Sequence, residues 1–322
     1  MMNHFRDLYL LDPDVTFLNH GSFGATPRPV FETYQAWQRR LEWQPVRFLG
    51  TELAGHLAEA RRALGDYLRA DAADLVYVPN TTFGVNVVAH SLRLGAGDEV
   101  LTTDHEYGAC DRVWRYLSRE RGFAYCRQPV ALPLTTDEEL VDHFWQGVTP
   151  RTRIIFLSHI TSPTAVRLPI AALCARARAA GILTLIDGAH APGQIDLDLP
   201  AIGADFYTGN CHKWMCAPKG TAFLHARPEQ HERLDASVIS WGYVAGSGGH
   251  TGFDAYTGNS TFERRLQWQG TRDICGWLAV GTAIDFHREH LPPEVRARCH
   301  ELALALMHEL AHEFDQAPIG RD

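Results

Sequence analysis

The stretch ILTLIDGAHAPGQIDLDLPAIGADFYTGNCHKWMCAPK, residues 182–219, decides the fold and points to the functional site. It opens with a short, mostly apolar run over 182–186, with the length and composition typical of a buried parallel strand. That run ends at Asp187, and a second short run over 204–208 leads to Lys213 a few residues later. Ligands of open α/β sheets bind outside the carboxyl ends of the strands, so we expect both side chains at such a site.

These two charged side chains suit one cofactor chemistry. An acid can hold a protonated pyridine nitrogen and a lysine can form an imine, which together indicate a pyridoxal phosphate (PLP) site. Each residue alone also has an ordinary explanation, Asp187 as the cap of a turn and Lys213 as a solvated surface charge. However, Lys213 lies between His212 and Trp214 in a segment with few other charges. Burial there would lower its pKa and favour the nucleophilic neutral amine.

Several motifs resemble one enzyme family. Asp187-Gly188-Ala189-His190, followed by Asn210-Cys211-His212-Lys213, is similar to the class V aminotransferase family of fold-type I PLP enzymes. This family includes cysteine desulfurases, kynureninase and isopenicillin N epimerase. The segments NHGSFG, NTTFGVN, DHEYGA, GNCHKW and QGTRD most resemble the isopenicillin N epimerase-like branch. The match runs in order from about residue 17 to about residue 286, which makes it specific.

The resemblance implies an α/β fold, with a PLP-binding large domain built on a mostly parallel sheet flanked by helices, plus a partial small C-terminal domain. The expected divisions are an N-terminal arm over 1–16, the large domain over 17–275, and a linker helix with the start of a truncated small domain over 276–322. Relatives continue into a small domain whose arginine binds the substrate carboxylate, and Arg47 or Arg272 is the expected partial substitute. A homodimer with shared active sites is also implied.

The resemblance assigns roles to individual residues. Lys213, Asp187 and His105 form the expected catalytic set: Lys213 binds the cofactor and then shuttles a proton, Asp187 holds the ring nitrogen, and His105 stacks on the ring, with Tyr107 as the alternative. His190 is expected at the phenolic oxygen. Ser162 stands where relatives carry an Asn-containing turn, with Ala165 where a Gly is common. The expected cofactor-binding set is Thr81, Thr82, His105, Ser162, Asp187, His190, Asn210, His212, Lys213, and Gly270 and Thr271, which would reach the phosphate of the partner subunit.

Two segments carry their own signal. An expected short strand over 75–78 precedes NTTFGVN and an apolar helix. This arrangement presents free N–H groups and threonine hydroxyls to a phosphate. The ordinary alternative is that the threonines only cap the helix. The segment NHGSFG, after an expected brief strand over 16–18, has two glycines that allow close approach, or form a plain turn. The resemblance places Asn19, His20 and Gly21 in the substrate pocket. Repeated strand–helix order predicts a mostly parallel sheet.

Composition excludes several classes of protein. Hydrophobic residues make up 45% and charged residues 21% of the chain, as in an ordinary globular protein. A formal net charge of -8 argues against nucleic-acid or anionic-membrane partners. No stretch approaches the ~20 apolar residues of a membrane span, and the N-terminus has no signal-peptide pattern, so we expect a cytoplasmic protein. The seven cysteines form no C-x-x-C pair and are expected to be buried thiols.

The motifs leave the reaction open. Epimerisation or racemisation at Cα and C–S lyase chemistry are the leading candidates for an amino-acid substrate. The alternatives are a class V transaminase, a cysteine desulfurase, or a non-catalytic dimeric relative. A desulfurase needs a mobile nucleophilic cysteine after Thr271, and we disfavour it because Cys275 and Cys299 lie in helical pattern. His308 to His312 fits the zinc-binding H-E-x-x-H pattern, but no third ligand follows in the last ten residues, so no metal is expected.

Overall fold

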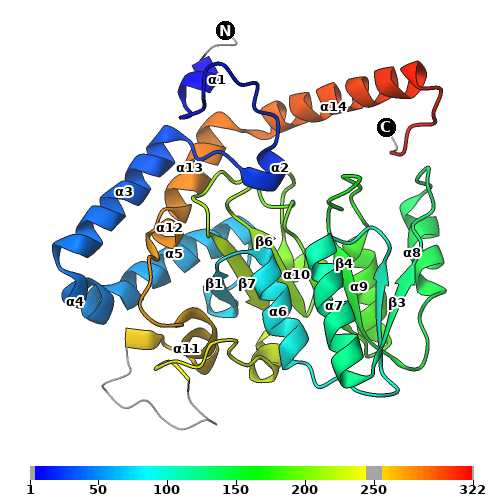
Figure 1. The fold of residues 1–322 in the computed structure, drawn as a ribbon, viewed down its shortest axis with the longest axis horizontal. Coiled ribbons are helices and arrows are strands. Elements are labelled where there is room, and N and C mark those ends of the chain that lie inside the picture. The colour runs from blue at the N-terminus through cyan, green and yellow to red at the C-terminus, as the bar shows by residue number, and fades with distance from the viewer. Residues whose placement is uncertain (1–3, 244–255, 321–322) are drawn as a thin grey trace.

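A seven-stranded sheet forms the centre of the chain, in a computed structural model that describes residues 4–243 and 256–320 (Figure 1). The strands are β1 (Leu75–Val78), β2 (Glu99–Thr103), β3 (Ala124–Gln128), β4 (Thr152–Ser158), β5 (Leu183–Asp187), β6 (Phe206–Asn210) and β7 (Ala222–Ala226). Their order is β1-β7-β6-β5-β4-β2-β3. Only β7 runs antiparallel to its neighbours, so six strands end at the same edge. The predicted mostly parallel sheet flanked by helices is confirmed.

Helices precede β1, follow β7 and lie in the connections between the strands from β1 to β6. They are α1 (His4–Asp7), α2 (His20–Phe23), α3 (Arg28–Trp43), α4 (Pro45–Arg47), the π-helix η1 (Phe48–Glu52), α5 (Leu53–Leu68), the 3₁₀ helix η2 (Ala72–Asp74), α6 (Thr81–Ser91), α7 (Gly108–Arg121), α8 (Asp137–Trp145), α9 (Ile170–Ala179), α10 (Leu199–Ile202), the 3₁₀ helix η3 (Pro228–Arg233), α11 (Thr261–Gln267), α12 (Cys275–Leu278), α13 (Val280–His290) and α14 (Pro293–Glu313).

Helices cover both faces of the sheet, which explains why its central strands read as unbroken apolar runs. In β4, alternate side chains enter two separate cores. Ile154 and Phe156 pack with α6 and α7, whereas Ile155 and Leu157 pack with α5, α9 and α13. All four side chains are fully buried, and each such burial contributes roughly 1.5–3 kcal/mol. Buried side chains on both faces therefore stabilise the sheet, whose carboxyl edge positions the residues that follow the strands.

Local signals set most element boundaries as expected, with one exception. Helix α3 ends at Trp43, and Gln44 caps α4, whose first residue is Pro45. The predicted strand over 16–18 is wrong. Asn19 instead caps helix α2, because its Oδ1 accepts a hydrogen bond from Ser22 N at 3.1 Å. Within the described residues no strand is formed over 16–18, and the Leu18 side chain is 84% exposed.

The C-terminal helices differ in how they pack. Helices α12 and α13 pack against α3 and α5, and all four residues of α12 are buried. Helix α14 has no buried residue and extends away from the sheet along the top of Figure 1. The division expected at residue 276 stays a prediction, and in packing terms the change comes two helices later, at α14.

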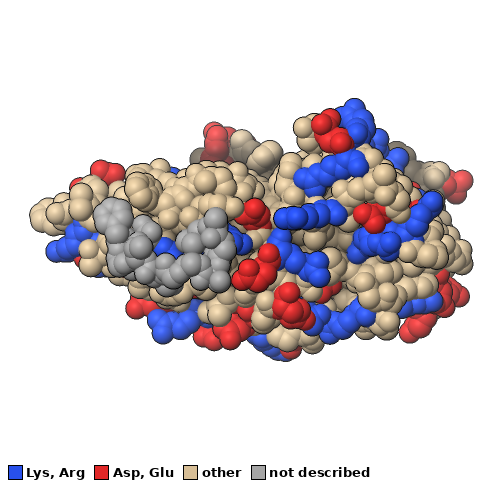
Figure 2. Space-filling model, turned by 90° about the horizontal axis from the view of Figure 1, so that it is seen from below, with Lys and Arg blue, Asp and Glu red and all other residues tan. Residues whose placement is uncertain are grey.

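Three further observations concern the surface. Within the described ranges, none of the helices combines the length and apolar character needed to cross a bilayer. The same ranges contain no group of three His, Cys, Asp or Glu side chains suited to a metal ion, and His308, Glu309 and His312 are exposed on α14. Figure 2 shows the face seen from below, where side chains of both charge signs lie next to one another.

Candidate active site

Asp187 and Lys213 meet at the carboxyl edge of two neighbouring strands. Asp187 is the last residue of β5 and is 3% exposed, and Lys213 follows the end of β6 by three residues. Burial raises the pKa of Asp187, while the backbone N–H of Ala189, the Cys110 thiol and the Lys213 charge each oppose this shift. Burial lowers the pKa of Lys213, and the charge of Asp187 opposes that shift. The two side chains therefore share one site, as the sequence predicted.

The carboxylate of Asp187 has room for a cationic partner. Its Oδ1 accepts a hydrogen bond from Ala189 N at 2.9 Å, and its Oδ2 is 3.5 Å from Cys110 Sγ, a weak donor. A buried carboxylate with so little compensation favours a protonated nitrogen beside it. This environment fits the ring nitrogen of pyridoxal phosphate.

Lys213 is held by backbone packing and by its side-chain neighbours. Its Nζ is 3.1 Å from His190 Nε2 and 5.9 Å from the centroid of the Tyr107 ring. Behind it, the backbone of Gly24 packs so closely that a Cβ there would lie 2.5 Å from Lys213 O and 2.9 Å from Lys213 Cα. The second glycine of NHGSFG is therefore required by close approach of two chain segments, a role that the sequence left open.

The first turn of α6 forms the end of the site suited to a phosphate. Asn210 Oδ1 accepts a hydrogen bond from Thr81 N at 2.9 Å, which ties the start of the helix to the end of β6. A Cβ at Gly84 would lie 2.9 Å from Thr208 Cβ, so the glycine lets α6 approach the sheet. The hydroxyl of Thr81 is buried and has no hydrogen-bond partner among the described residues. An unsatisfied donor at a helix N-terminus fits a phosphate oxygen.

Two further predicted phosphate residues have observed partners. His212 is partly buried, and its Nδ1 lies 2.9 Å from Thr221 O, so this nitrogen carries a proton and donates it to the carbonyl. The carbonyl of Thr82 accepts from Asn86 Nδ2 at 2.8 Å. With Thr81 and Asn210, these residues are brought together after β1 and β6, as the sequence predicted. Their contacts with a phosphate stay predictions.

At the end of β2, the two flat side chains have different observed partners. His105 Nδ1 is 3.1 Å from Thr164 Oγ1, while Tyr107 faces Lys213. Ser162 is exposed, and it is Thr164 from the same turn that reaches His105. Ala165 adopts a φ of 54°, the left-handed conformation that explains a glycine at this position in relatives. The stacking role of His105 and the contact of Ser162 stay predictions.

Helix α2 carries the predicted substrate residues to the same edge. A Cβ at Gly21 would lie 3.1 Å from Trp214 Cζ2 and 3.6 Å from His190 Cε1. The His20 ring stacks on Trp214 with a centroid distance of 6.3 Å. Asn19 is exposed and caps the helix. His20 and Gly21 are thus beside the Lys213 site, whereas the observed contact of Asn19 is a structural one.

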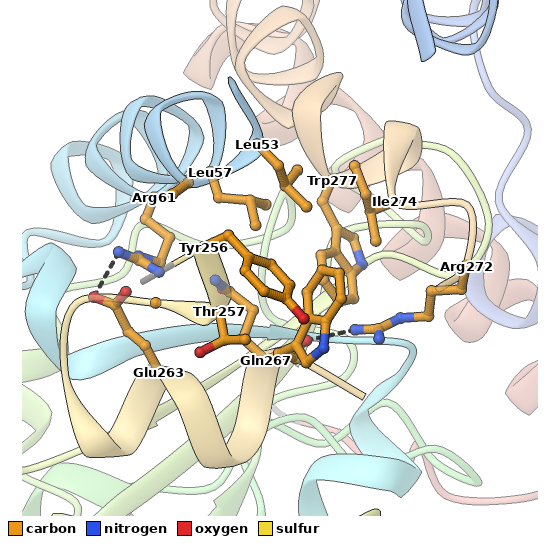
Figure 3. Close-up of a pocket in the computed structure, with 13 residues that line it drawn as sticks. Leu53, Leu57, Arg61, Tyr256, Thr257, Glu263, Gln267, Arg272, Ile274 and Trp277 are labelled. Carbon is orange, nitrogen blue, oxygen red and sulfur yellow. Dashed lines mark hydrogen bonds and ion pairs between the residues drawn. The ribbon is translucent and has the colours of Figure 1, made fainter. Parts of the chain in front are cut away.

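Gly270 and Thr271 are the predicted residues that this chain does not bring to Lys213. They lie on the connection between α11 and α12, which Figure 1 shows away from the carboxyl edge of the sheet. Trp268, Arg272 and Ile274 of the same connection line the pocket shown in Figure 3. Arg272 of this connection donates to Gln267 O at 2.6 Å and stacks on Trp277. Arg47, the other expected substitute for the carboxylate arginine, pairs with Glu52 at 2.8 Å.

Sequence reasoning missed two residues of the site. Glu106 lies below the edge and accepts hydrogen bonds from Thr103 Oγ1 at 2.7 Å and Ser158 Oγ at 2.6 Å, which ties β2 to β4. Burial raises its pKa to about 7. Trp214 donates from Nε1 to His190 Nδ1 at 3.3 Å. An acid within DHEYGA and an aromatic residue directly after the lysine were the available signals.

Comparisons with known proteins agree with this geometry. The profile of the family described as Aminotransferase class-V matches residues 24–317. The chain is 42% identical over 301 residues to an isopenicillin N epimerase of Streptomyces clavuligerus, covering 92% of this chain and 75% of that one. It is 31% identical over 294 residues to a probable chloroplastic L-cysteine desulfhydrase of Arabidopsis thaliana, covering 85% and 58%. A cysteine desulfurase structure from Thermococcus onnurineus NA1 has a TM-score of 0.78 at 20% identity, covering 96% and 76%.

These findings confirm the predicted family, fold, enzyme class and cofactor. The family match covers most of the chain, and the relatives at 42% and 31% identity belong to the same group of enzymes. The solved structure supports the fold independently. The chain belongs to the class V aminotransferase family of pyridoxal-phosphate-dependent enzymes.

Proposed function

We propose that this chain is an epimerase or racemase that acts at the Cα of an amino acid. The observation that carries the proposal is the pairing of Lys213 and Asp187 at adjacent strand ends in a chain 42% identical to an isopenicillin N epimerase. Bound there, pyridoxal phosphate supplies an electron sink that stabilises negative charge at the substrate Cα. Asp187 would hold its ring nitrogen, and Thr81, Thr82, Asn210 and His212 would hold its phosphate.

The remaining chemistry belongs to the side chains of the protein. Lys213 Nζ would hold the cofactor covalently, and its free amine would be the base that moves the Cα proton. His190 Nε2 is 3.1 Å from this amine, where it can hydrogen-bond the phenolic oxygen of the cofactor. His105 would stack on the cofactor ring, with Tyr107, whose ring centroid lies 5.9 Å from Lys213 Nζ, as the alternative. His20 and Gly21 line the substrate side.

The attachment point can be tested with little ambiguity, because the chain has only two lysines, Lys213 and Lys219. Borohydride reduction of the cofactor-loaded chain should fix the label on Lys213. Lys213→Ala should lose the absorbance of the bound cofactor near the visible edge. Lys219→Ala is the matched control, since Lys219 Nζ contacts Thr26 Oγ1 at 3.4 Å, and it should keep this absorbance. A label on Lys219 alone would refute the assignment.

Incubation of the loaded chain with candidate amino acids in deuterated water distinguishes the reactions. Deuterium incorporation at Cα with inversion supports the epimerase or racemase. Release of pyruvate instead supports a C–S lyase, the second candidate, which the 31% identity to a desulfhydrase favours. Absence of both, with the cofactor bound, would leave the non-catalytic relative.

A cysteine desulfurase is disfavoured by the state of its candidate nucleophiles. Cys275 is fully buried at the start of α12, and burial together with the neighbouring Asp273 raises the pKa of its thiol. Cys299 lies exposed on the regular helix α14. A thiolate on a mobile segment is required for that reaction, so neither residue meets the requirement.

We also propose a cytoplasmic homodimer with shared sites. The position of Gly270 and Thr271 away from Lys213 of their own chain supports a role in the partner's site. Mixing Lys213→Ala chains with Thr271→Ala chains should then restore activity, because one of the two sites in a mixed dimer carries neither change. Activity no higher than that of the separate variants would refute the shared site. All seven cysteines are free thiols, which supports a reducing compartment.

A further inference from the structure

His190 has a different partner on each ring nitrogen, and the two partners are consecutive residues. Trp214 Nε1 lies 3.3 Å from His190 Nδ1, and Lys213 Nζ lies 3.1 Å from His190 Nε2. Both partners belong to the loop after β6, while His190 belongs to the loop after β5. The imidazole therefore lies between the indole and the amine at the carboxyl edge of the sheet.

The indole determines which nitrogen of His190 carries the proton. An indole N–H can only donate a hydrogen bond, so His190 Nδ1 must accept and be unprotonated. Burial and the charge of Lys213 lower the pKa of His190 to about 4, so the ring holds a single proton at neutral pH. That proton is on Nε2, which faces Lys213.

We propose that Trp214 is a positioning residue that fixes His190 in the Nε2–H tautomer and thereby presents a donor, not an acceptor, to Lys213 Nζ. A donor at 3.1 Å pairs with the lone pair of a neutral amine and opposes an ammonium, which would place two donors face to face. The opposite tautomer would offer a lone pair and stabilise the ammonium. The indole thus sets the sign of the effect of His190 on the protonation of the amine.

Three other segments hold Trp214, one through its ring and two through its backbone. Helix α2 lies against it, since a Cβ at Gly21 would be 3.1 Å from Trp214 Cζ2 and the His20 ring stacks on it at 6.3 Å. Helix α13 supplies His287, whose Nε2 donates to Trp214 O at 3.0 Å. A Cβ at Gly193 would lie 2.5 Å from Trp214 C. His20 and Gly21 therefore reach the lysine through the tryptophan, in addition to the direct packing of Gly24 on the Lys213 backbone.

Other groups near the amine do not depend on the indole. Asp187 and Cys110 raise the pKa of Lys213, the Tyr107 ring lies 5.9 Å from its Nζ, and the charge of Lys213 lowers the pKa of His212. Removing the indole N–H leaves these groups in place. A change in Lys213 protonation on its removal therefore reports the tautomer of His190.

The tautomer can be measured directly in the full chain before cofactor is added. Long-range ¹H–¹⁵N spectra of histidine-labelled protein distinguish the two neutral forms, and comparison with His190→Gln assigns the signal. We expect Nε2–H in the wild-type chain. The Nδ1–H form, or a doubly protonated ring at neutral pH, would overturn the proposal. This measurement does not depend on how any Trp214 variant folds.

The effect on the amine is measured by titrating lysine labelled with ¹³C at Cε, which gives signals from only two lysines. Trp214→Phe keeps a ring but removes the donor. It should raise the pKa of Lys213 by about one unit, the tenfold change that one hydrogen bond to a charged group typically contributes. Lys219 is the internal control and should not move. An unchanged Lys213 titration in a folded Trp214→Phe chain would overturn the proposal.

A matched variant controls for loss of any indole. Trp114 is fully buried, and its Nε1 has no hydrogen-bond partner in the described part of the chain. Trp114→Phe should leave the Lys213 titration at its wild-type midpoint, and a shift equal to that of Trp214→Phe would refute a specific role. Only the catalytic consequence rests on the proposed function. A correct tautomer with no Cα exchange would refute that function alone, and exchange with the wrong tautomer would refute only this inference.

Discussion

Gly24→Ala tests whether the packing behind Lys213 sets the geometry of the site. A Cβ at this position would meet the backbone on three sides, 2.5 Å from Lys213 O, 2.9 Å from Lys213 Cα and closest to His212 O. Ordinary contact begins near 3.4 Å, so the lysine backbone must move by about 0.9 Å. Overpacking of this kind typically costs ~1–3 kcal/mol of folding free energy. A misplacement of ~1 Å at a catalytic group can reduce the rate by ~100-fold.

Two measurements check this expectation. Urea unfolding of the chain should show the loss of stability, and deuterium incorporation at the substrate Cα should show the loss of rate at saturating cofactor. Gly55→Ala is the matched control, because Gly55 is exposed in α5 with no atom within 4 Å of a Cβ there. It should stabilise the helix by up to ~1 kcal/mol and leave the rate unchanged. Wild-type stability and rate in Gly24→Ala would refute the packing argument.

Three other predictions follow from individual contacts. Thr81→Val removes a buried hydroxyl without a partner among the described residues, so the cofactor-free chain should gain ~1 kcal/mol of stability in urea unfolding. Its cofactor affinity should fall ~10-fold in a fluorescence titration. Stability and cofactor affinity that change in the same direction would contradict the phosphate assignment. Burial lowers the pKa of His225 to about 4, so the fold loses stability as pH falls from about 6.5 toward 4. His225→Leu should reduce the loss of unfolding free energy over this pH window by about 2.5 kcal/mol. The same pH dependence of unfolding free energy in wild type and variant would contradict this prediction. Ala165→Gly relieves the strain of a φ of 54° and should raise the free energy of unfolding by up to ~1 kcal/mol, measured in urea. A lower free energy of unfolding would show that the turn is unstrained.

Much of the fold could be predicted because its signals are local. Short apolar runs between polar turns indicated β1, β5 and β6 within two residues, since both faces of these strands are buried. The strand expected over 16–18 failed because an apolar run gives no indication of whether a neighbouring strand exists, and Asn19 favoured a helix cap instead. The partners of the two flat side chains after β2 also depended on packing, since Tyr107 faces Lys213 and His105 contacts Thr164.

The sequence by itself determined the chemical groups of the site and their order along the chain. An acid after one buried strand and a lysine after the next had to meet at one edge, because parallel neighbouring strands end on the same side. Only the tertiary structure decided what surrounds that lysine. Gly24 against its backbone and the Trp214 indole on His190 join segments brought together by packing, and side-chain periodicity carries no information about such contacts. The sequence pattern thus identified the side chains of the site, and tertiary packing determined their geometry and protonation.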